Sequence, residues 1–120
     1  MDNFQLVLPE HLNHYGYLFG GILLKWVDES AYIAARIEYP GRSFVTVGMK
    51  EVRFKKQVES GSILRFHTKE VKSGNTSVTY QVSVYTEENQ ASEEQEIFTT
   101  SITFVCIDKE GNKRNLTDPE

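Results

Sequence analysis

The residues best suited to chemistry in this sequence lie close together, between Asn13 and Asp28. Gly20 and Gly21 precede the expected start of a helix, where the first backbone N–H groups have no intrahelical acceptor. A substrate can approach a glycine backbone closely, and free N–H groups stabilise negative charge that develops on an oxygen. The glycine pair therefore predicts an oxyanion site, although a tight turn from loop to helix is an alternative that the same residues allow.

Asp28 follows Gly21 by seven residues, about two helical turns, so the two lie on nearly the same face of the expected helix. This face borders the apolar arc, and a half-buried carboxylate there is placed to act as a general base. Glu29 is expected on the polar face. The structural alternatives are an ordinary boundary carboxylate for Asp28 and a loop or capping role for Asn13.

Other catalytic schemes find less support in the sequence. The three histidines, His11, His14 and His67, have no spacing typical of metal ligands, and no serine lies in a Gly-x-Ser-x-Gly motif. The single cysteine, Cys106, lies within an apolar run, where packing is the usual role. We therefore expect neither a metal site nor a disulfide.

Charge and hydropathy limit the possible partners and compartments. A net charge of −4 argues against nucleic acid as a partner, because nucleic-acid binders usually carry a basic face. No apolar run approaches the ~20 residues that span a bilayer, and the first residues lack the features of a signal peptide. A soluble, cytoplasmic protein without membrane contact is expected.

The elements that must position these residues form one domain over residues 1–120. Apolar residues recur with helical periodicity over residues 21–37, and Pro40 and Gly41 follow. Alternating or apolar runs predict strands at residues 4–8, 44–54, 62–71, 76–86 and 96–107. Residues 72–75 are expected to close a hairpin, and residues 87–96 to form an acidic, solvated loop. This order predicts an α+β fold in which a five-stranded antiparallel sheet wraps around one long helix, with exposed edges that favour a dimer.

The run from Asn13 to Glu29 resembles the acyl-CoA thioesterases of the hotdog superfamily, in the branch that includes bacterial YciA-like and animal cytosolic acyl-CoA hydrolases. Their pattern is Asn, two residues, Gly, two residues, Phe/His-Gly-Gly, and then a helix that reaches Asp or Asp-Glu. The turn from Phe54 to Gly61 is similar to theirs, with Gln57 in place of the usual proline, and residues 71–77 resemble their hairpin. The opening His11-Leu12-Asn13 differs from their common Asp-Thr-Asn.

The resemblance implies the hotdog fold and hydrolysis of an acyl-CoA to CoA and a carboxylic acid, with no cofactor besides the CoA of the substrate. It implies that Asp28 activates water or attacks the thioester and that Asn13 orients water or substrate. It further implies that the backbone amides of Gly20 and Gly21 polarise the thioester carbonyl. It also implies a homodimer in which Asn13 and Asp28 meet across the interface, with a hexamer, a trimer of dimers, as the larger form.

The substrate and its CoA have a wider set of candidate contacts. They are Phe19, Lys55, Lys56, Gly74, Asn75 and Thr76. Solvated charge at a strand end is the alternative for the two lysines. The alternative function is a non-catalytic acyl-CoA sensor or carrier of the same fold, although the chain contains no basic helix to serve as an output module. A hotdog dehydratase is a third possibility, but this chain has no pairing of His and Asp on the central helix that would serve such an enzyme.

Overall fold

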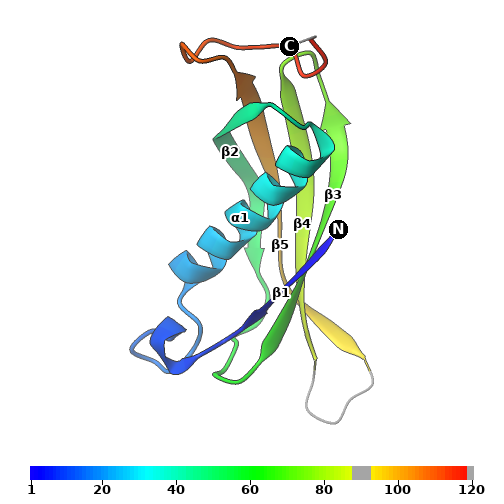
Figure 1. Ribbon diagram of the computed structural model, residues 1–120. Helices are drawn as coiled ribbons and strands as arrows, with labels where there is room; N and C mark the ends of the chain where they lie inside the picture. Colours follow the sequence, from blue (N-terminus) through cyan, green and yellow to red (C-terminus); the bar gives the residue numbers. More distant parts are fainter. Residues whose placement is uncertain (88–92, 119–120) are drawn as a thin grey trace.

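A computed structural model describes residues 1–87 and 93–118 of the chain. The elements follow in the order β1 (Asp2–Leu6), η1 (Pro9–His11), α1 (Gly20–Glu38), β2 (Ser43–Phe54), β3 (Ile63–Ser73), β4 (Ser77–Glu87) and β5 (Glu94–Ile107). The strands form one antiparallel sheet in the order β1-β3-β4-β5-β2 (Figure 1). This confirms the predicted α+β sheet around one long helix.

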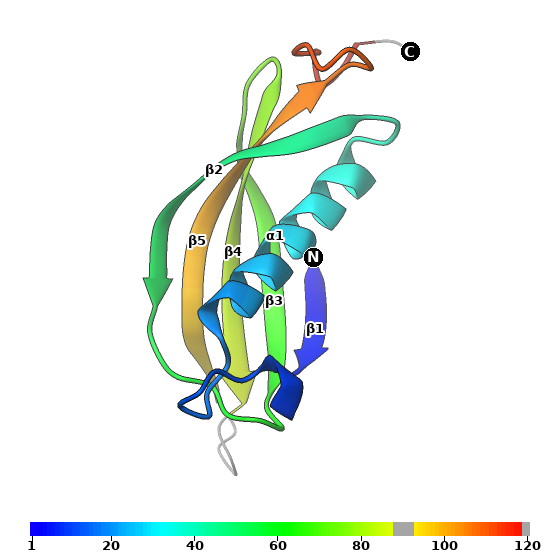
Figure 2. The same cartoon turned by 90° about the vertical axis from the view of Figure 1, so that its left-hand side faces the viewer.

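The helix α1 lies across the concave side of the sheet, with β1 and β2 at opposite edges (Figure 2). Its buried face is formed by residues spaced three or four apart, as an amphipathic helix requires. They are Leu23, Trp26, Val27, Ser30, Ala31, Ala34 and Ala35. The three alanines have small side chains and let the helix axis approach the sheet closely. The helix ends at Glu38, where the N–H of Tyr39 donates to the carbonyl of Ala35 and Pro40 follows.

The sheet supplies the other half of the core through the inward residues of its central strands. Val78, Tyr80, Val82 and Val84 of β4 are all 0–1% exposed, which confirms the predicted alternation in this strand. Phe66 of β3 and three residues of β5, Phe98, Ile102 and Phe104, are equally buried. The core therefore lies between α1 and the middle of the sheet.

The strand bounds differ from the expectation at several ends. Lys72 and Ser73, expected in the hairpin turn, belong to β3, and Glu87, expected in the acidic loop, belongs to β4. The first strand is Asp2–Leu6 instead of residues 4–8, and the turn Pro9–His11 interrupts the expected loop. In the expected acidic loop, residues 88–92 lie outside the described residues, and Glu94 and Gln95 extend β5, which was expected to begin at Glu96. The prediction for Glu94 and Gln95 was wrong because cationic side chains from outside the segment hold both residues on the strand: Arg65 pairs with Glu94 at 2.8 Å, and Lys56 donates to Gln95 at 2.8 Å.

The edge strand β2 is irregular and exposes apolar side chains. Its register against β5 shifts between Thr46 and Gly48 and again between Lys50 and Arg53, and Glu51 has a φ of 54° at the second shift. Val45, Val47, Val52 and Phe54 are 41–57% exposed.

Within residues 1–87 and 93–118, no helix is long and apolar enough to cross a membrane.

Candidate active site

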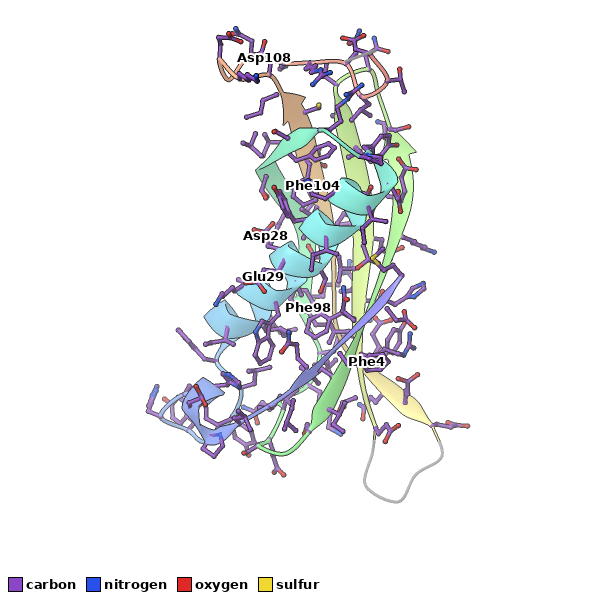
Figure 3. All side chains as sticks on the ribbon, viewed as in Figure 1. Phe4, Asp28, Glu29, Phe98, Phe104 and Asp108 are labelled. Atoms are coloured by element: carbon purple, nitrogen blue, oxygen red, sulfur yellow. The ribbon has the colours of Figure 1, made fainter. Side chains whose placement is uncertain are left out.

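Asp28 lies on the side of α1 that faces β2, at the border of the buried face (Figure 3). The side chain is half-buried, and its Oδ1 accepts a hydrogen bond of 2.8 Å from the hydroxyl of Thr46 on β2. Glu29 is exposed and pairs with Lys25 one turn earlier at 3.9 Å. The predicted helical phase of the two carboxylates is therefore confirmed.

The start of α1 presents two open hydrogen-bond donors. Phe19 is the residue before the helix, and its carbonyl accepts the N–H groups of Ile22 at 3.0 Å and Leu23 at 3.2 Å. In the described part of the chain, no acceptor meets the N–H groups of Gly20 and Gly21. A side chain at Gly21 would press on the Phe19 ring, 3.3 Å from the position of its Cβ. This arrangement can receive an oxygen that becomes negatively charged.

Asn13 shapes the loop that leads into the helix. Its Oδ1 accepts the N–H groups of Tyr15 at 2.9 Å and Tyr17 at 3.2 Å, and its own N–H donates to the carbonyl of Tyr17 at 2.7 Å. The Nδ2 group, by contrast, has no acceptor among residues 1–87 and 93–118. The loop role is thus present in one chain, while no hydrogen bond within the described residues joins Asn13 to Asp28.

A pocket of about 340 Å³ lies beside Gly20. Its lining consists of Leu18, Gly20, Leu23, Phe54, Lys55, Lys56, Gln57 and Val58. The N–H of Leu18 donates to the carbonyl of Val58 at 2.8 Å, so the early loop is fixed against the turn that follows β2. The structure therefore brings the two candidate lysines next to a candidate oxyanion glycine.

The lysines are held by residues of β5. Lys55 pairs with Glu96, and Lys56 Nζ donates to Gln95 Oε1 at 2.8 Å. Phe19, the remaining candidate near the helix start, is 56% exposed.

The hairpin candidates Gly74, Asn75 and Thr76 lie elsewhere. Figure 1 shows the turn between β3 and β4 at the end of the sheet opposite to the start of α1. Two backbone carbonyls of this turn accept hydrogen bonds from the same chain. The carbonyl of Asn75 accepts the N–H of Leu116 at 2.9 Å, and that of Thr76 accepts the N–H of Cys106 at 2.7 Å. Within one chain, these residues do not meet the lysines or the glycines.

Thr46 is the functional candidate that sequence reasoning missed. A threonine within a run of valines is typical of any strand, and the sequence does not reveal that it faces Asp28. The only signal was the general expectation that the sheet wraps around the helix.

Two tyrosines hold the far end of α1 on the sheet. Burial raises the pKa of Tyr39 to about 12, and its hydrogen bond to Glu70 of β3 adds to the shift. Burial also raises the pKa of Tyr80, whose hydroxyl donates to Glu38 at 3.0 Å. These contacts secure the helix and lie apart from the glycines.

No group of three or more His, Cys, Asp or Glu side chains suited to a metal ion occurs in residues 1–87 and 93–118.

Comparison with known proteins places this geometry in a family. Residues 15–93 match the thioesterase superfamily model. Mouse acyl-coenzyme A thioesterase 11 is 32% identical over 102 residues, which cover 85% of this chain and 17% of that protein. An uncharacterized acyl-CoA thioester hydrolase of Haemophilus influenzae is 30% identical over 115 residues, covering 92% of this chain and 73% of that protein. The chain thus spans about a sixth of the mouse protein.

Solved structures share the fold along almost the whole chain. A hexameric thioesterase of Yersinia pestis has 27% identity and a TM-score of 0.87, covering 97% of this chain and 93% of that one. A hexameric hotdog fold thioesterase of Campylobacter jejuni has 29% identity and a TM-score of 0.85, and the match covers 94% of this chain and 86% of that one. The acyl-CoA hydrolase of Staphylococcus aureus has 27% identity and a TM-score of 0.87, and the match covers 96% of this chain and 70% of that one. The chain belongs to the thioesterase superfamily and has the hotdog fold.

Proposed function

We propose that this chain hydrolyses acyl-CoA thioesters to CoA and a carboxylic acid. The observation that carries the proposal is the open pair of N–H donors at Gly20 and Gly21, which begins the same helix that carries the half-buried Asp28. The donors would bind the thioester carbonyl oxygen and stabilise its negative charge in the transition state. A group of this kind typically contributes about 3 to 4 kcal/mol to that stabilisation.

The helix geometry indicates that a complete site needs two chains. With a rise of 1.5 Å per residue, Gly21 and Asp28 are about 10 Å apart along the axis of α1. A carbonyl bound at Gly21 is therefore out of reach of Asp28 in the same chain. In the proposed homodimer, the glycines and Asn13 of one chain face Asp28 and Thr46 of the other.

Asp28 has two possible roles in this site. As a general base, it takes a proton from water while the water oxygen attacks the carbonyl carbon, the C–S bond breaks, and the proton passes to the departing thiolate. As a nucleophile, it attacks the carbonyl carbon with a carboxylate oxygen, and the C–S bond breaks to release the thiolate of CoA. Water then hydrolyses the resulting anhydride, which frees the carboxylic acid and Asp28 and supplies the proton that the thiolate takes up. In both routes Asn13 Nδ2 orients water or substrate, and no cofactor besides the CoA of the substrate takes part.

The Staphylococcus aureus hydrolase supports these roles. Its solved forms include complexes with butyryl coenzyme A and coenzyme A, and variants in which an asparagine, an aspartate or a threonine is replaced by alanine. The residues proposed here, Asn13, Asp28 and Thr46, are of the same three types. The asparagine also precedes the aspartate by fifteen positions in both chains.

The assembly and the nucleotide site extend the proposal. The similar hexamers support a homodimer as the minimum unit and a trimer of dimers as the larger form. Antiparallel pairing of β2 strands would bring the Gly74–Thr76 turn of one chain near the Lys55–Lys56 end of the other, where they would contact the nucleotide of CoA. A cytoplasmic location, with no nucleic acid or membrane partner, is part of the proposal.

Thiol release from a panel of acyl-CoAs tests the function. The Asp28→Asn variant keeps the size and polarity of the side chain but cannot take up the proton, so kcat should fall at least ~10²-fold with little change in melting temperature. Glu29→Gln is the matched control and should retain activity, because Glu29 is exposed on the polar face. No turnover on any acyl-CoA, with CoA binding retained, would contradict the proposal and favour a sensor or carrier.

A further inference from the structure

Residues 108–118, here called the C-terminal segment, fold back from the end of β5 onto the turn between β3 and β4. The N–H of Arg114 donates to the carbonyl of Cys106 at 2.9 Å, which keeps the segment beside β5. The N–H of Leu116 then donates to the carbonyl of Asn75 at 2.9 Å. Figure 1 shows the segment and the β3–β4 turn at the same end of the sheet. The segment therefore holds the turn that is proposed to contact the nucleotide of CoA.

Arg42 holds the C-terminal segment from the opposite side. This residue lies between α1 and β2 and is 7% exposed. Its Nε donates to the carbonyl of Leu116 at 2.9 Å, and its Nη2 donates to the carbonyl of Asp118. A buried guanidinium is stable only where its N–H groups are hydrogen-bonded, so the cation and the segment stabilise each other. The side chain of Leu116, 6% exposed, packs in the core and adds to this attachment.

A tight turn fixes the backbone from which Arg42 extends. The N–H of Arg42 donates to the carbonyl of Tyr39 at 3.3 Å, with Pro40 and Gly41 at the two central positions. Gly41 has a φ of 78°, as the third residue of a type II turn requires. The hydroxyl of Tyr39 is bonded to Glu70 on β3. The position of the guanidinium is therefore set by rigid parts of the fold.

The attachment of the β3–β4 turn uses its backbone and leaves its side chains open. The carbonyls of Asn75 and Thr76 accept N–H groups of Leu116 and Cys106. Among residues 1–87 and 93–118, the side chains of Asn75 and Thr76 have no hydrogen-bond partner. The amide and the hydroxyl are thus available to a ligand. A turn that is already fixed also loses less conformational entropy when it binds one.

We propose that Arg42 is a positioning residue for the nucleotide of CoA, because it fixes the Gly74–Thr76 turn through the C-terminal segment. The inference rests on the proposed thioesterase function and on the nucleotide contact proposed for this turn. It adds a residue that determines affinity for CoA without touching the thioester. Since pairing of β2 strands brings the turn to the site of the partner, Arg42 of one chain acts on the site of the other.

Comparison of an acyl-CoA with the corresponding acyl-pantetheine, which has the same thioester but no nucleotide, tests the inference on the full chain. Arg42→Gln weakens the attachment of the segment, so KM for the acyl-CoA and the calorimetric Kd of CoA should rise about tenfold. KM for the acyl-pantetheine and kcat for both substrates should change little. Arg36→Gln is the matched control, because Arg36 is exposed on α1 and its guanidinium contacts Tyr32 of the same helix.

A double variant tests whether Arg42 acts through the turn. Asn75→Ala removes a side chain of the turn and should also raise KM for the acyl-CoA alone. If both substitutions affect the same contact, the Arg42→Gln, Asn75→Ala chain should raise this KM by less than the product of the two single effects. An effect equal to the product would mean that the two residues act independently, and it would contradict the inference.

Two results with Arg42→Gln would overturn the inference: an unchanged KM for the acyl-CoA, or an equal rise for both substrates, as a general loss of structure would cause. If Arg42→Gln does not fold, Arg42→Lys keeps the buried cation without the planar fork and should raise the same KM by a smaller amount. An unchanged KM in that variant counts equally against the inference. No turnover by the wild type would contradict the thioesterase, and the Kd of CoA would still decide the role of Arg42.

Discussion

At the scale of single residues, the carboxylate of Asp28 is held through one oxygen. Oδ1 accepts the hydroxyl of Thr46, while Oδ2 has no donor in the described part of the chain. We therefore propose Thr46 as a positioning residue: its hydroxyl fixes the carboxylate between helix and edge strand and leaves the other oxygen for a proton or for the substrate.

The Thr46→Val variant tests this role, because valine keeps the branched shape and removes the hydroxyl. A hydrogen bond to a charged group contributes about 1.5 kcal/mol, so kcat should fall about tenfold if the bond orients Asp28 for the reaction. KM should change little, and the melting temperature should fall by a few degrees, because the same bond joins β2 to α1. Thr46→Ser restores the donor and should recover most of kcat; a valine variant with full kcat would contradict the positioning role.

The two parts of this contact were not equally predictable. The periodicity of α1 predicts that Asp28 borders the core and that Glu29 faces solvent, and both positions are confirmed. The partner Thr46 could not be predicted from the strand alone. Alternation from the buried Phe44 places Thr46 on the helix side of β2, but it does not tell which helix residue the hydroxyl meets, because that depends on how α1 lies across the strand.

At the scale of elements, the loop before α1 depends on one side chain. Asn13 Oδ1 holds two backbone N–H groups, while an isolated bridge between Leu12 and Leu18 closes the loop. The proposed catalytic role uses the other atom of the amide, Nδ2. The two roles of Asn13 can therefore be separated by substitution.

The Asn13→Asp variant keeps an oxygen acceptor for the loop and removes the Nδ2 donor. Its stability should stay within about 0.5 kcal/mol of the wild type, and its kcat should fall at least ~10²-fold. Asn13→Ala removes both functions and should also lower the free energy of unfolding by about 1 kcal/mol. Denaturant unfolding and thiol release measure the two effects. If Asn13→Asp keeps its activity, Asn13 serves only to shape the loop.

The far end of α1 gives a prediction with a defined pH window. Burial and the bond to Glu70 raise the pKa of Tyr39 to about 12, from about 10 in the unfolded chain. A group whose pKa is raised by folding contributes stability fully below the unfolded pKa and loses it as pH rises through the folded pKa. The contribution of Tyr39 should therefore disappear between about pH 10 and about pH 12.

Comparison with Tyr39→Phe isolates that contribution from other groups that titrate at high pH. At neutral pH the variant should be about 1 kcal/mol less stable, because it lacks the hydroxyl. The difference from the wild type should shrink as pH rises above about 10, as measured by denaturant unfolding in steps of pH. A difference that stays constant over this window would mean that Tyr39 gains no stability from its protonated form.

Most elements were predictable because their signals are local. The alternation in β4 and the periodicity of α1 lie within short windows, and the five strands and the helix are confirmed. Glu94 and Gln95 were wrongly assigned to a loop because their partners, Arg65 and Lys56, are distant in the sequence. Likewise, a sequence does not show that Phe54 and Val58 enclose a pocket beside Gly20, because that depends on how the turn after β2 folds onto the early loop.

At the scale of the whole molecule, the edge strand β2 and the proposed catalytic residues point to the same partner, a second copy of the chain. Val45, Val47 and Val52 are exposed on this edge, and an open edge with apolar side chains favours pairing with another chain. The distance between Gly21 and Asp28 along one helix independently supports the proposal that a second helix completes the site. A twofold dimer satisfies both requirements and forms two equivalent sites.

Mixing two inactive variants tests the shared site. In a heterodimer of Asn13→Ala and Asp28→Ala chains, one site contains both substitutions, and the other combines an intact Asn13 with an intact Asp28. If chains assort at random after unfolding and refolding together, half of the dimers are mixed, and thiol release should recover to about a quarter of the wild-type activity. Each variant refolded alone is the control and should stay inactive. Mass spectrometry of the native dimers, with a mass tag on one variant, should confirm that mixed dimers form. Mixed dimers without activity would show that Asn13 and Asp28 act within one chain, and an active monomer in sedimentation at micromolar concentration would lead to the same conclusion.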